Sequence, residues 1–428
     1  MPDHRPCPIC GGVARRALHR QRFLDGPLGD GYDVVVCTTC GAGFADGIPS
    51  QAELDAYYAE RSKYTYDQSG GAESPYDFQR FERIADQVVP FLPSPAARIL
   101  DVGCATGGLL AVLKRRGFTN VLGADPSPAC AAAARRLHGV EVRVAALQQL
   151  AGWTDRFDQI LLVGVLEHLR EVGPAVETVR QLLTQGGMVY CAQPDVAAFA
   201  DCVNAPYQQF SLEHVNFFSE TSLNRLMGRY GLASLRIWHW LVEWREGVSD
   251  SVVSGVYAPL AAPAGSRSSV PEDRSAAGET GMAIVPQLPG SSSLPPPPPA
   301  LIAPSLSIDR ESEPALERYL ARCRGEDATL HAAIERLVQS REPVLVWGAG
   351  TLTRRLLATT RLSEANITAF VDANPAIQGQ QLAGRTVLDP SAIVNQRVPI
   401  AVLSKAFERE IVTVIRQKLR LTNRIITF

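Results

Sequence analysis

The sequence lacks an excess of either charge, a long apolar run and an apolar leader at its start. Because 42 lysines and arginines balance 44 acidic residues over 428 positions, the formal net charge is −2, which does not fit the basic surface of a nucleic-acid binder. No run approaches the ~18 apolar residues that a membrane span needs. Residues 1–10 carry Pro, Asp, His and Arg instead of the apolar core of a secretory signal. We therefore expect a cytoplasmic protein that binds neither nucleic acid nor a membrane.

Cysteine is sparse along most of the sequence, but four of the nine cysteines fall within the first forty residues. They form two Cys-x-x-Cys pairs, each followed by a glycine: Cys7, Cys10, Cys37 and Cys40. Without an export signal, reduced or metal-bound cysteines are more common than disulfides. Two such pairs can bring four thiolates onto one tetrahedral Zn²⁺, and a site filled by protein ligands is structural. We expect a structural zinc ion; unrelated thiols, a redox pair or a nucleic-acid-binding zinc ribbon are the alternatives.

Short apolar runs alternate with helical patterns in two parts of the sequence, and this alternation predicts parallel, doubly wound sheets. The expected fold class is α/β. The length allows two to four domains. The segment 249–312 is rich in Ser, Pro, Ala and Gly and contains the proline run 295–299, so we expect a disordered or polyproline linker there. The expected units are a zinc-binding module at 1–55, a Rossmann-like domain at 56–248 and a smaller Rossmann-like domain at 313–428.

A run of small residues follows the apolar strand that begins at Ile99. It places Asp101, Gly103 and Gly107 before a helix, and Asp125 ends the next strand 24 residues after Asp101. Small residues let a ligand approach the backbone, and an acid at the end of the second strand is placed for ribose hydroxyls. An acid at the start of the loop disfavours a pyrophosphate and favours a cationic or zwitterionic ligand. This pattern indicates S-adenosylmethionine (SAM) rather than a dinucleotide.

The loop resembles the first motif of class I SAM-dependent methyltransferases, Asp/Glu-x-Gly-x-Gly-x-Gly, with Ala105 in the middle glycine position. One methyl group there is tolerated if φ is negative. The resemblance extends through Asp125-Pro126-Ser127 and the fourth strand. It implies that ten residues contact the cofactor: Asp101, Gly103, Cys104, Ala105, Gly107, Asp125, Pro126, Ala146, Leu147 and Gly164. The alternative is a Rossmann-like domain for another nucleotide or for none.

The whole layout resembles the zinc-containing C-methyltransferases that act on nucleotide-linked keto-deoxy sugars. A four-Cys module, a methyltransferase domain, a Glu213-His214 segment followed by Phe217-Phe218-Ser219, and a C-terminal Rossmann-like domain occur in that order. The resemblance implies that Glu213 and His214 lie beside the substrate and that His214 deprotonates the carbon that receives the methyl group. The family usually has a tyrosine where this sequence has Ser211, so the sugar and the choice between C- and O-methylation stay open.

The chemistry of that step also fits the residue types. A carbon next to a ketone becomes nucleophilic once a base removes its proton, and imidazole titrates in the range needed. Glu213 would orient the histidine or bind a hydroxyl group. The alternative is a capped loop before a helix that starts near Ser219. His168 is a second candidate, or else a packing or capping residue.

Five tyrosines precede or begin the cofactor domain and are candidates for a lid over the site: Tyr57, Tyr58, Tyr64, Tyr66 and Tyr76. Tyrosines are also common on ordinary amphipathic surfaces. We favour Tyr64 and Tyr76 as the members that face the site.

The C-terminal part repeats the nucleotide-binding arrangement, with Gly348 and Gly350 after a strand and Asp372 at the end of the next one. Thr353 replaces the third glycine. The family resemblance implies support for the nucleotide-sugar site, and a purely structural domain or a separate NAD-dependent activity are the alternatives. Taken together, the sequence predicts a SAM-dependent methyltransferase that C-methylates a nucleotide-linked keto sugar. The rivals are an O-methyltransferase acting on a saccharide or small natural product, and an inactive zinc-ribbon binding protein.

Overall fold

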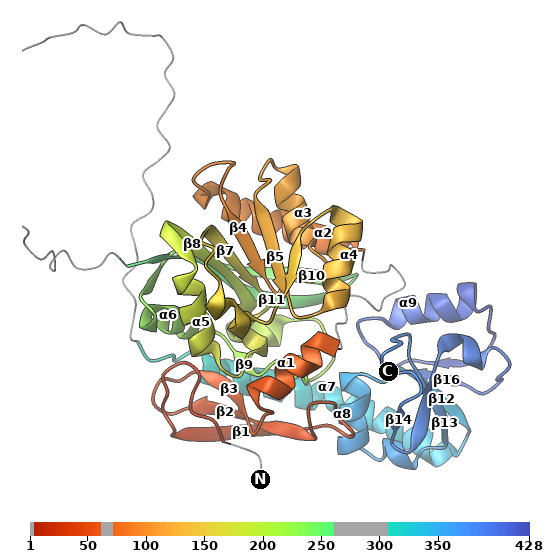
Figure 1. The fold of residues 1–428 in the computed structure, drawn as a ribbon. Helices are drawn as coiled ribbons and strands as arrows, with labels where there is room; N and C mark the ends of the chain where they lie inside the picture. The colour runs from red at the N-terminus through yellow and green to blue at the C-terminus, as the bar shows by residue number, and fades with distance from the viewer. Residues whose placement is uncertain (1–3, 61–71, 261–306) are drawn as a thin grey trace, which may run out of the picture.

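The computed structural model describes residues 4–60, 72–260 and 307–428, which form three sheets and their covering helices (Figure 1). The sheets have four, seven and six strands and follow one another roughly in sequence order. The α/β class predicted from the sequence is confirmed. None of the described helices combines the length and apolar character needed to cross a membrane.

The N-terminal sheet is antiparallel and has the order β1-β2-β3-β9. Its strands are β1 (Arg15–Arg22), β2 (Gly31–Cys37), β3 (Gly43–Asp46) and β9 (Asn216–Phe217). The last strand comes from the middle of the sequence, where Asn216 pairs with Phe44. The sheet that carries the cysteines therefore extends beyond the predicted module at 1–55 and includes residues that closely follow His214. Helix α1 (Gln51–Glu60) follows β3 in the sequence.

The central sheet has the order β10-β11-β8-β7-β4-β5-β6, and β11 is the one strand of this sheet that runs opposite to the other six. Its strands are β4 (Ile99–Val102), β5 (Val121–Asp125), β6 (Val142–Val144), β7 (Phe157–Val163), β8 (Leu183–Pro194), β10 (Leu232–Arg245) and β11 (Val248–Pro259). All four residues of β4 are buried. This burial explains why three of the four residues, Ile99, Leu100 and Val102, are apolar, because a central strand of a parallel sheet is covered on both faces.

Helices cover both faces of the central sheet. They are α2 (Pro75–Val88), α3 (Gly108–Arg115), α4 (Pro128–His138), α5 (Val172–Gln181) and α6 (Glu220–Arg229), with short 3₁₀ turns η2 (Val89–Phe91), η3 (Leu147–Gly152), η4 (Leu166–His168) and η5 (Val196–Asp201). α2 and α3 share one apolar cluster with Ile99 and Leu161. α5 and α6 share another with Leu100 and Leu162. Alternate residues of a strand thus serve opposite faces.

The predicted linker is wrong at its beginning, because residues 249–259 belong to β11 and lie inside the central sheet between β8 and β10. The serines and glycine that resemble a linker stand among valines there, and Ser251, Ser254 and Val256 are all buried. The buried hydroxyl groups have hydrogen-bond partners: Ser251 Oγ donates to Asp195 O at 2.8 Å, and Ser254 Oγ donates to Gln87 Oε1 at 2.9 Å. The proline run of the predicted linker lies outside the described residues.

The C-terminal domain contains a six-stranded sheet of order β14-β15-β13-β12-β16-β17. Its strands are β12 (Val344–Trp347), β13 (Ile367–Val371), β14 (Gln381–Leu382), β15 (Arg385–Leu388), β16 (Ile400–Val402) and β17 (Ile425–Ile426). Its helices are α7 (Ser312–Ser340), α8 (Thr351–Thr359) and α9 (Glu408–Thr413), with turns η6 (Leu362–Glu364), η7 (Pro390–Ile393) and the π-helical η8 (Val414–Lys418).

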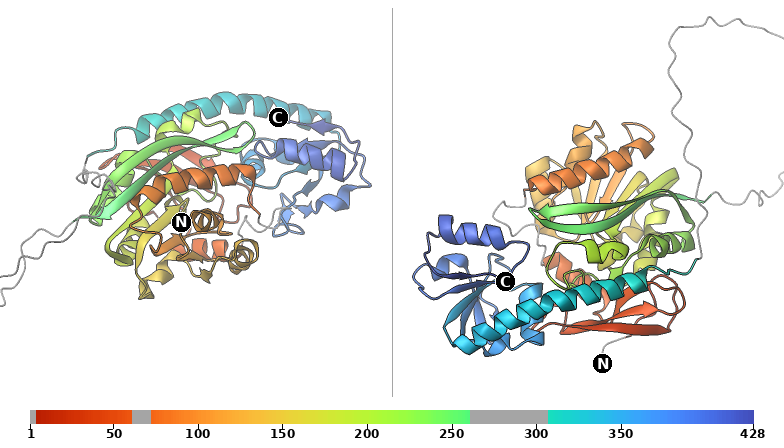
Figure 2. Two further views of the ribbon diagram at one scale, coloured as in Figure 1. Left: turned by 90° about the horizontal axis from the view of Figure 1, so that it is seen from above. Right: turned by 180° about the vertical axis from the view of Figure 1, so that it is seen from behind.

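The long helix α7 joins the two ends of the molecule (Figure 2). Tyr319 and Cys323 in its first half pack into the core of the N-terminal sheet. Ile334 and Leu337 in its second half pack into the core of the C-terminal domain. The helix therefore belongs to both units, and a boundary at residue 313 assigns it wholly to one of them.

Candidate functional site

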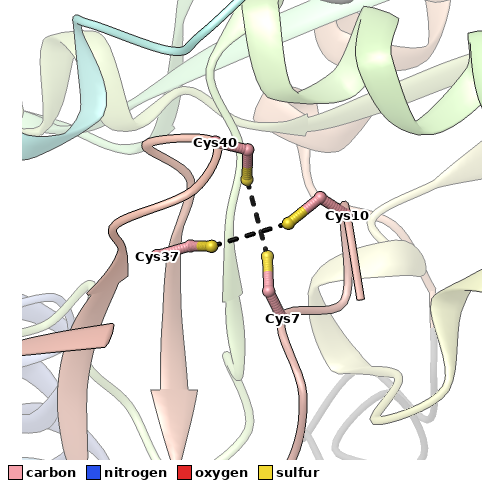
Figure 3. A group of neighbouring side chains, drawn as sticks. All are labelled: Cys7, Cys10, Cys37 and Cys40. Carbon is pink, nitrogen blue, oxygen red and sulfur yellow. Dashed lines mark hydrogen bonds between the residues drawn. The ribbon is translucent and has the colours of Figure 1, made fainter. Parts of the chain in front are cut away.

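The four cysteines of the N-terminal pairs converge on one point (Figure 3). Their ligand atoms all lie within 4.8 Å of one another. The sulfur atoms of Cys7 and Cys40 are 3.6 Å apart, and those of Cys10 and Cys37 are 3.5 Å apart. A tetrahedral zinc site with Zn–S bonds of about 2.3 Å requires sulfur separations of about 3.8 Å. The donor set and its spacing fit one Zn²⁺, and the predicted grouping of the cysteines is confirmed.

Both Cys-x-x-Cys pairs use the same turn. Gly11 N donates to Cys7 O and Gly41 N donates to Cys37 O, each at 2.8 Å. Gly11 and Gly41 have φ values of 77° and 83°, in the left-handed region that glycine enters without a steric cost. The glycine after each second cysteine therefore lets the backbone turn back, so that both thiols of a pair point to the same centre.

The glycine-rich loop leaves the buried strand β4 and opens helix α3, as the sequence predicts. Gly103, Ala105 and Gly107 all have positive φ, with Ala105 at 47°. The condition under which a methyl group is tolerated at this position, a negative φ, is therefore not met. The loop needs the left-handed conformation there because the Ala105 N–H donates to Asp125 Oδ2 at 2.9 Å. A β-carbon on Gly103 would lie 2.8 Å from Val165 Cγ2, so this position requires glycine for space as well.

Two acids lie at the carboxyl ends of the neighbouring strands β4 and β5: Asp101 is the residue before the end of β4, and Asp125 ends β5. Asp125 accepts hydrogen bonds from the backbone of Ala105 and, at 2.9 Å, of Ser127, while Ser127 caps the start of α4. Burial raises the pKa of Asp125 despite these bonds. Burial, with the nearby Asp125 as the second cause and Arg80 opposing it, raises the pKa of Asp101 to about 8. A cationic ligand beside Asp101 would favour the ionised carboxylate.

The remaining predicted cofactor residues lie on the same side of the sheet, at the ends of its parallel strands or in the turns after them. Cys104 is buried in the glycine-rich loop, and Pro126 is the residue between Asp125 and the cap of α4. Ala146 and Leu147 begin η3 after β6. Gly164, with φ of 66°, follows β7. This is the edge at which ligands bind in open α/β sheets.

Two histidines meet after β7. The rings of His168 in η4 and His214 in the loop before β9 lie 5.0 Å apart, centre to centre, at an angle of 70°. His168 Nδ1 lies 2.9 Å from the hydroxyl of Tyr58 and 3.1 Å from the carbonyl oxygen of Glu213. Residues distant in sequence are thus brought to one point beside the turn at Gly164.

The Glu213-His214 turn is held separately from the helix cap that follows it. Ser211 Oγ accepts the backbone N–H groups of Glu213 at 3.3 Å and His214 at 3.1 Å. Ser219 and Ser222 form a capping box at the start of α6, as the alternative from the sequence predicts. The cap therefore exists, but it does not account for the conformation of Glu213 and His214.

Two neighbouring tyrosines of α1 reach this site. The Tyr57 hydroxyl donates to Glu213 Oε1 at 2.9 Å, and Tyr58 contacts His168 as described above. Tyr64, which the sequence favoured, lies outside the described residues, and Tyr76 lies at the start of α2, within electrostatic range of Arg409 of α9. The sequence pointed to a tyrosine cluster without indicating that Tyr57 and Tyr58 are the members that contact the acid and the histidine.

Glu73 is a site residue that the sequence did not reveal. Its carboxylate accepts from Thr106 Oγ1 at 3.0 Å and pairs with His138 Nε2 at 2.9 Å. A β-carbon on Gly108 would lie 2.6 Å from Glu73 Oε1. The segment before α2 therefore packs directly against the glycine-rich loop, and no local motif marks a contact between segments more than thirty residues apart.

A cavity of about 410 Å³ lies next to Tyr57, between α1 and the turn that joins β1 to β2. Its lining is partly apolar and partly acidic: Pro27, Leu28, Gly29, Pro49, Glu53, Ala56, Tyr57 and Glu60. Because Tyr57 also binds Glu213, one tyrosine links the cavity to the histidine pair.

Glu167, His168 and His214 also offer ligand atoms within 4.8 Å of one another. One carboxylate and two imidazoles form a donor set that divalent metals accept. The same three groups can also serve as acid–base groups without a metal.

The C-terminal loop copies the geometry of the first one. Asp372 accepts the backbone N–H groups of Ala349 at 2.8 Å and Asn374 at 2.9 Å, as Asp125 does with Ala105 and Ser127. Thr353, which replaces the third glycine, is buried and donates to Gly348 O at 2.6 Å. The threonine hydroxyl thus closes this loop by binding a backbone carbonyl of the loop itself.

Comparison with known proteins supports the cofactor domain. Residues 76–237 match a family described as a methyltransferase domain. The ubiquinone biosynthesis O-methyltransferases of Cereibacter sphaeroides and Agrobacterium fabrum are 35% identical over 107 residues and 36% over 105 residues, which are 24% and 23% of the present sequence. In both cases the match spans 42% of the relative, so less than half of the length of these relatives is represented here.

A solved structure of magnesium protoporphyrin IX methyltransferase from Synechocystis PCC 6803 with bound SAM aligns with 48% of the present protein and 96% of its own length, at 15% identity and a TM-score of 0.34.

Proposed function

We propose that this protein, whose residues 76–237 match a methyltransferase-domain family, uses SAM to methylate a carbon atom of a nucleotide-linked keto-deoxy sugar. The observation that carries the proposal is the meeting of His168, His214 and Glu213 after β7, on the same edge of the sheet as the glycine-rich loop. A methyl donor site and a group of bases at one edge are the two parts that carbon methylation needs.

The cofactor side of the site is assigned to the loop and the strand ends. Asp101 and Asp125 would hold the charged and ribose parts of SAM, and Gly103, Ala105 and Gly107 leave room for it. Cys104, Pro126, Ala146, Leu147 and Gly164 would complete the surface. When bound, SAM supplies an electrophilic methyl group.

On the acceptor side, His214 is the proposed base that removes the proton next to the ketone. Glu213 and His168 assist it, and both are held by tyrosine hydroxyls, Glu213 by Tyr57 at 2.9 Å and His168 by Tyr58 at 2.9 Å. A base acts efficiently when its neighbours fix its orientation before the reaction. The α1 helix therefore contributes to catalysis by fixing the groups around the base.

Two further assignments belong to this proposal. The four cysteines bind one structural Zn²⁺, and the distances between their sulfur atoms fit a tetrahedral site. The C-terminal domain supports the nucleotide part of the acceptor, and the enzyme works in the cytoplasm on a small-molecule substrate.

O-methylation of a saccharide or small natural product is the second candidate. It is favoured by Ser211, which stands where the C-methyltransferases usually have tyrosine, and by the O-methyltransferase relatives. O-methylation needs no enolate, so the two reactions differ before any methyl group moves.

The test exploits this difference. The protein is incubated in D₂O with a nucleotide-linked 4-keto-6-deoxy sugar and without SAM, and exchange at the carbon next to the ketone is followed by NMR. C-methylation predicts exchange that His214→Gln abolishes. A wild-type protein that methylates the sugar without catalysing exchange would support O-methylation.

A further inference from the structure

Asn216 holds the segment that carries His168. Its side chain is buried, and Nδ2 donates to the carbonyl oxygens of Leu166 and Leu169, each at 2.7 Å. These two carbonyls lie on either side of His168. The backbone of the same region is tied by Val215 N, which donates to Glu167 O at 2.8 Å.

Arg5 holds Asn216 and its neighbours from the opposite side. Its buried guanidinium donates through Nη2 to Val215 O at 2.6 Å and to Asn216 Oδ1 at 2.8 Å. Nη1 donates to Arg170 O at 2.9 Å, and Nε donates to Ala45 O of β3 at 3.0 Å. One arginine thus contacts the residue after His214, the residue two positions after His168, and the N-terminal sheet.

We propose that Arg5 and Asn216 are positioning residues, which together fix the separation and angle of the His168 and His214 rings. The catalytic importance of that geometry rests on the proposed function. In the hydrogen bonds given above both side chains bind the backbone of the two histidine-bearing segments, so they act on the rings through that backbone. Arg5 lies two residues before Cys7, and the pair thereby fastens the histidines to the sheet that carries the cysteine cluster.

The direction of these bonds makes the proposal specific. Asn216 supplies two donors to two carbonyl oxygens and one acceptor to Arg5. An aspartate of nearly the same shape keeps the acceptor but places an oxygen against Leu166 O and Leu169 O. Two attractions become two repulsions, and the turn that carries His168 is pushed away from His214.

The C-terminal domain contains a matched control. Asn423 is also buried, and its Nδ2 also donates to two carbonyl oxygens, those of Gln396 at 2.9 Å and Val398 at 2.6 Å. Asn423→Asp therefore makes the same chemical change in a comparable setting, in a loop of the C-terminal domain before β17 instead of beside the histidines. Arg5→Lys is a second test variant. It keeps the positive charge but loses the planar guanidinium, whose N–H donors point in fixed directions.

The experiment compares full-length wild type, Asn216→Asp, Arg5→Lys and Asn423→Asp by histidine-selective NMR, by SAM titration and by steady-state kinetics. The protein has 7 histidines, and the ring signals are assigned with His168→Gln and His214→Gln. We expect Asn216→Asp and Arg5→Lys to shift the His168 and His214 signals and to leave those of His19, His138, His239 and His331 unchanged. His4 is not used as a reference, because it neighbours Arg5 and binds Asp46 at 2.8 Å. The SAM affinity stays at the wild-type value while kcat falls by about 100-fold, as expected for a displacement of about 1 Å.

The proposal is overturned if the two histidine signals stay in place in both variants, or if Asn423→Asp lowers kcat as much as Asn216→Asp does. If Asn216→Asp does not fold, Arg5→Lys alone decides between these outcomes. The NMR measurement needs no methyl acceptor and therefore tests the positioning of the two histidine rings independently of the proposed function. A wild-type protein that methylates no keto sugar would refute the proposed function alone.

Discussion

The Ala105 backbone N–H donates to the Asp125 carboxylate at 2.9 Å, and Ala105 adopts a φ of 47° to make this bond. The two residues end or follow adjacent strands, and their bond closes the loop that would face the cofactor. The left-handed conformation costs an L-residue free energy that glycine does not lose. The glycine-rich loop of this protein therefore contains one strained position.

The strain at Ala105 is testable by changing only the side chain. Ala105→Gly should keep or raise the melting temperature, because the left-handed conformation suits glycine. Ala105→Val should lower the free energy of unfolding by about 1–2 kcal/mol, because a β-branched side chain is least tolerated there. Thermal melting and SAM titration check both variants. Equal melting temperatures for the alanine and valine proteins would contradict this interpretation of the loop.

Asp101 should make the stability of the cofactor-free protein depend on pH. Its pKa is raised to about 8 in the folded protein, against about 3.9 in an unfolded polypeptide. A carboxyl group whose pKa is higher in the folded than in the unfolded protein stabilises the fold fully at pH values below its unfolded pKa. This stabilisation is lost as the pH rises through the folded pKa of about 8. Asp101→Asn should therefore melt at a higher temperature than wild type at pH 9, with a smaller difference at pH 5, and should bind SAM more weakly. Parallel melting profiles would contradict the assignment.

The cysteine cluster should bind one zinc ion per protein molecule and depend on it for stability. Removal of Zn²⁺ with a strong chelator, or Cys37→Ser, should lower the melting temperature, because metal binding contributes free energy to the folded state. Elemental analysis measures the metal content. Cys202→Ser is the matched control, because Cys202 is buried outside the cluster and its loss should leave the zinc content unchanged. Full stability after complete zinc removal would refute a structural role.

Tyr57→Phe and Tyr58→Phe each remove one hydroxyl from the candidate site. Because a hydrogen bond to a charged or ionisable group is worth about 1.5 kcal/mol, each variant should lower kcat by about 10-fold. The SAM affinity should not change, since the hydroxyls bind Glu213 and His168 on the acceptor side of the site. Tyr76→Phe is the control. A loss of activity in Tyr76→Phe alone would place the functional tyrosine on α2 instead of α1.

Local patterns predicted the parts of the fold that depend on local sequence. The two Cys-x-x-Cys pairs, the glycine-rich loop with Asp125, and the paired loop at Gly348 and Asp372 each combine a strand, a turn and a spacing. Such features can be predicted from the sequence because a tight turn or a buried strand requires particular residue types at consecutive positions.

The rest of the site depends on contacts between distant segments, which no local pattern reports. Asn216 contacts Leu166 and Leu169, and Arg5 reaches Val215 from the N-terminal segment. The sequence predicts a linker where β11 begins, because the serines and glycine of this strand give it the composition of a flexible segment, while its pairing with β8 and β10 is a tertiary contact. The positive φ of Ala105 follows from its bond to Asp125, a tertiary contact.

Methyl transfer to a defined acceptor is the decisive test of the proposed function. Purified protein and SAM are incubated with a panel of nucleotide-linked 4-keto-6-deoxy sugars, and the products are analysed by mass spectrometry with fragmentation. We predict a gain of one methyl group on a ring carbon of at least one sugar, and no product with His214→Gln. A protein that binds SAM but methylates no member of the panel, or places the methyl group on oxygen, would contradict carbon methylation of a nucleotide-linked keto sugar.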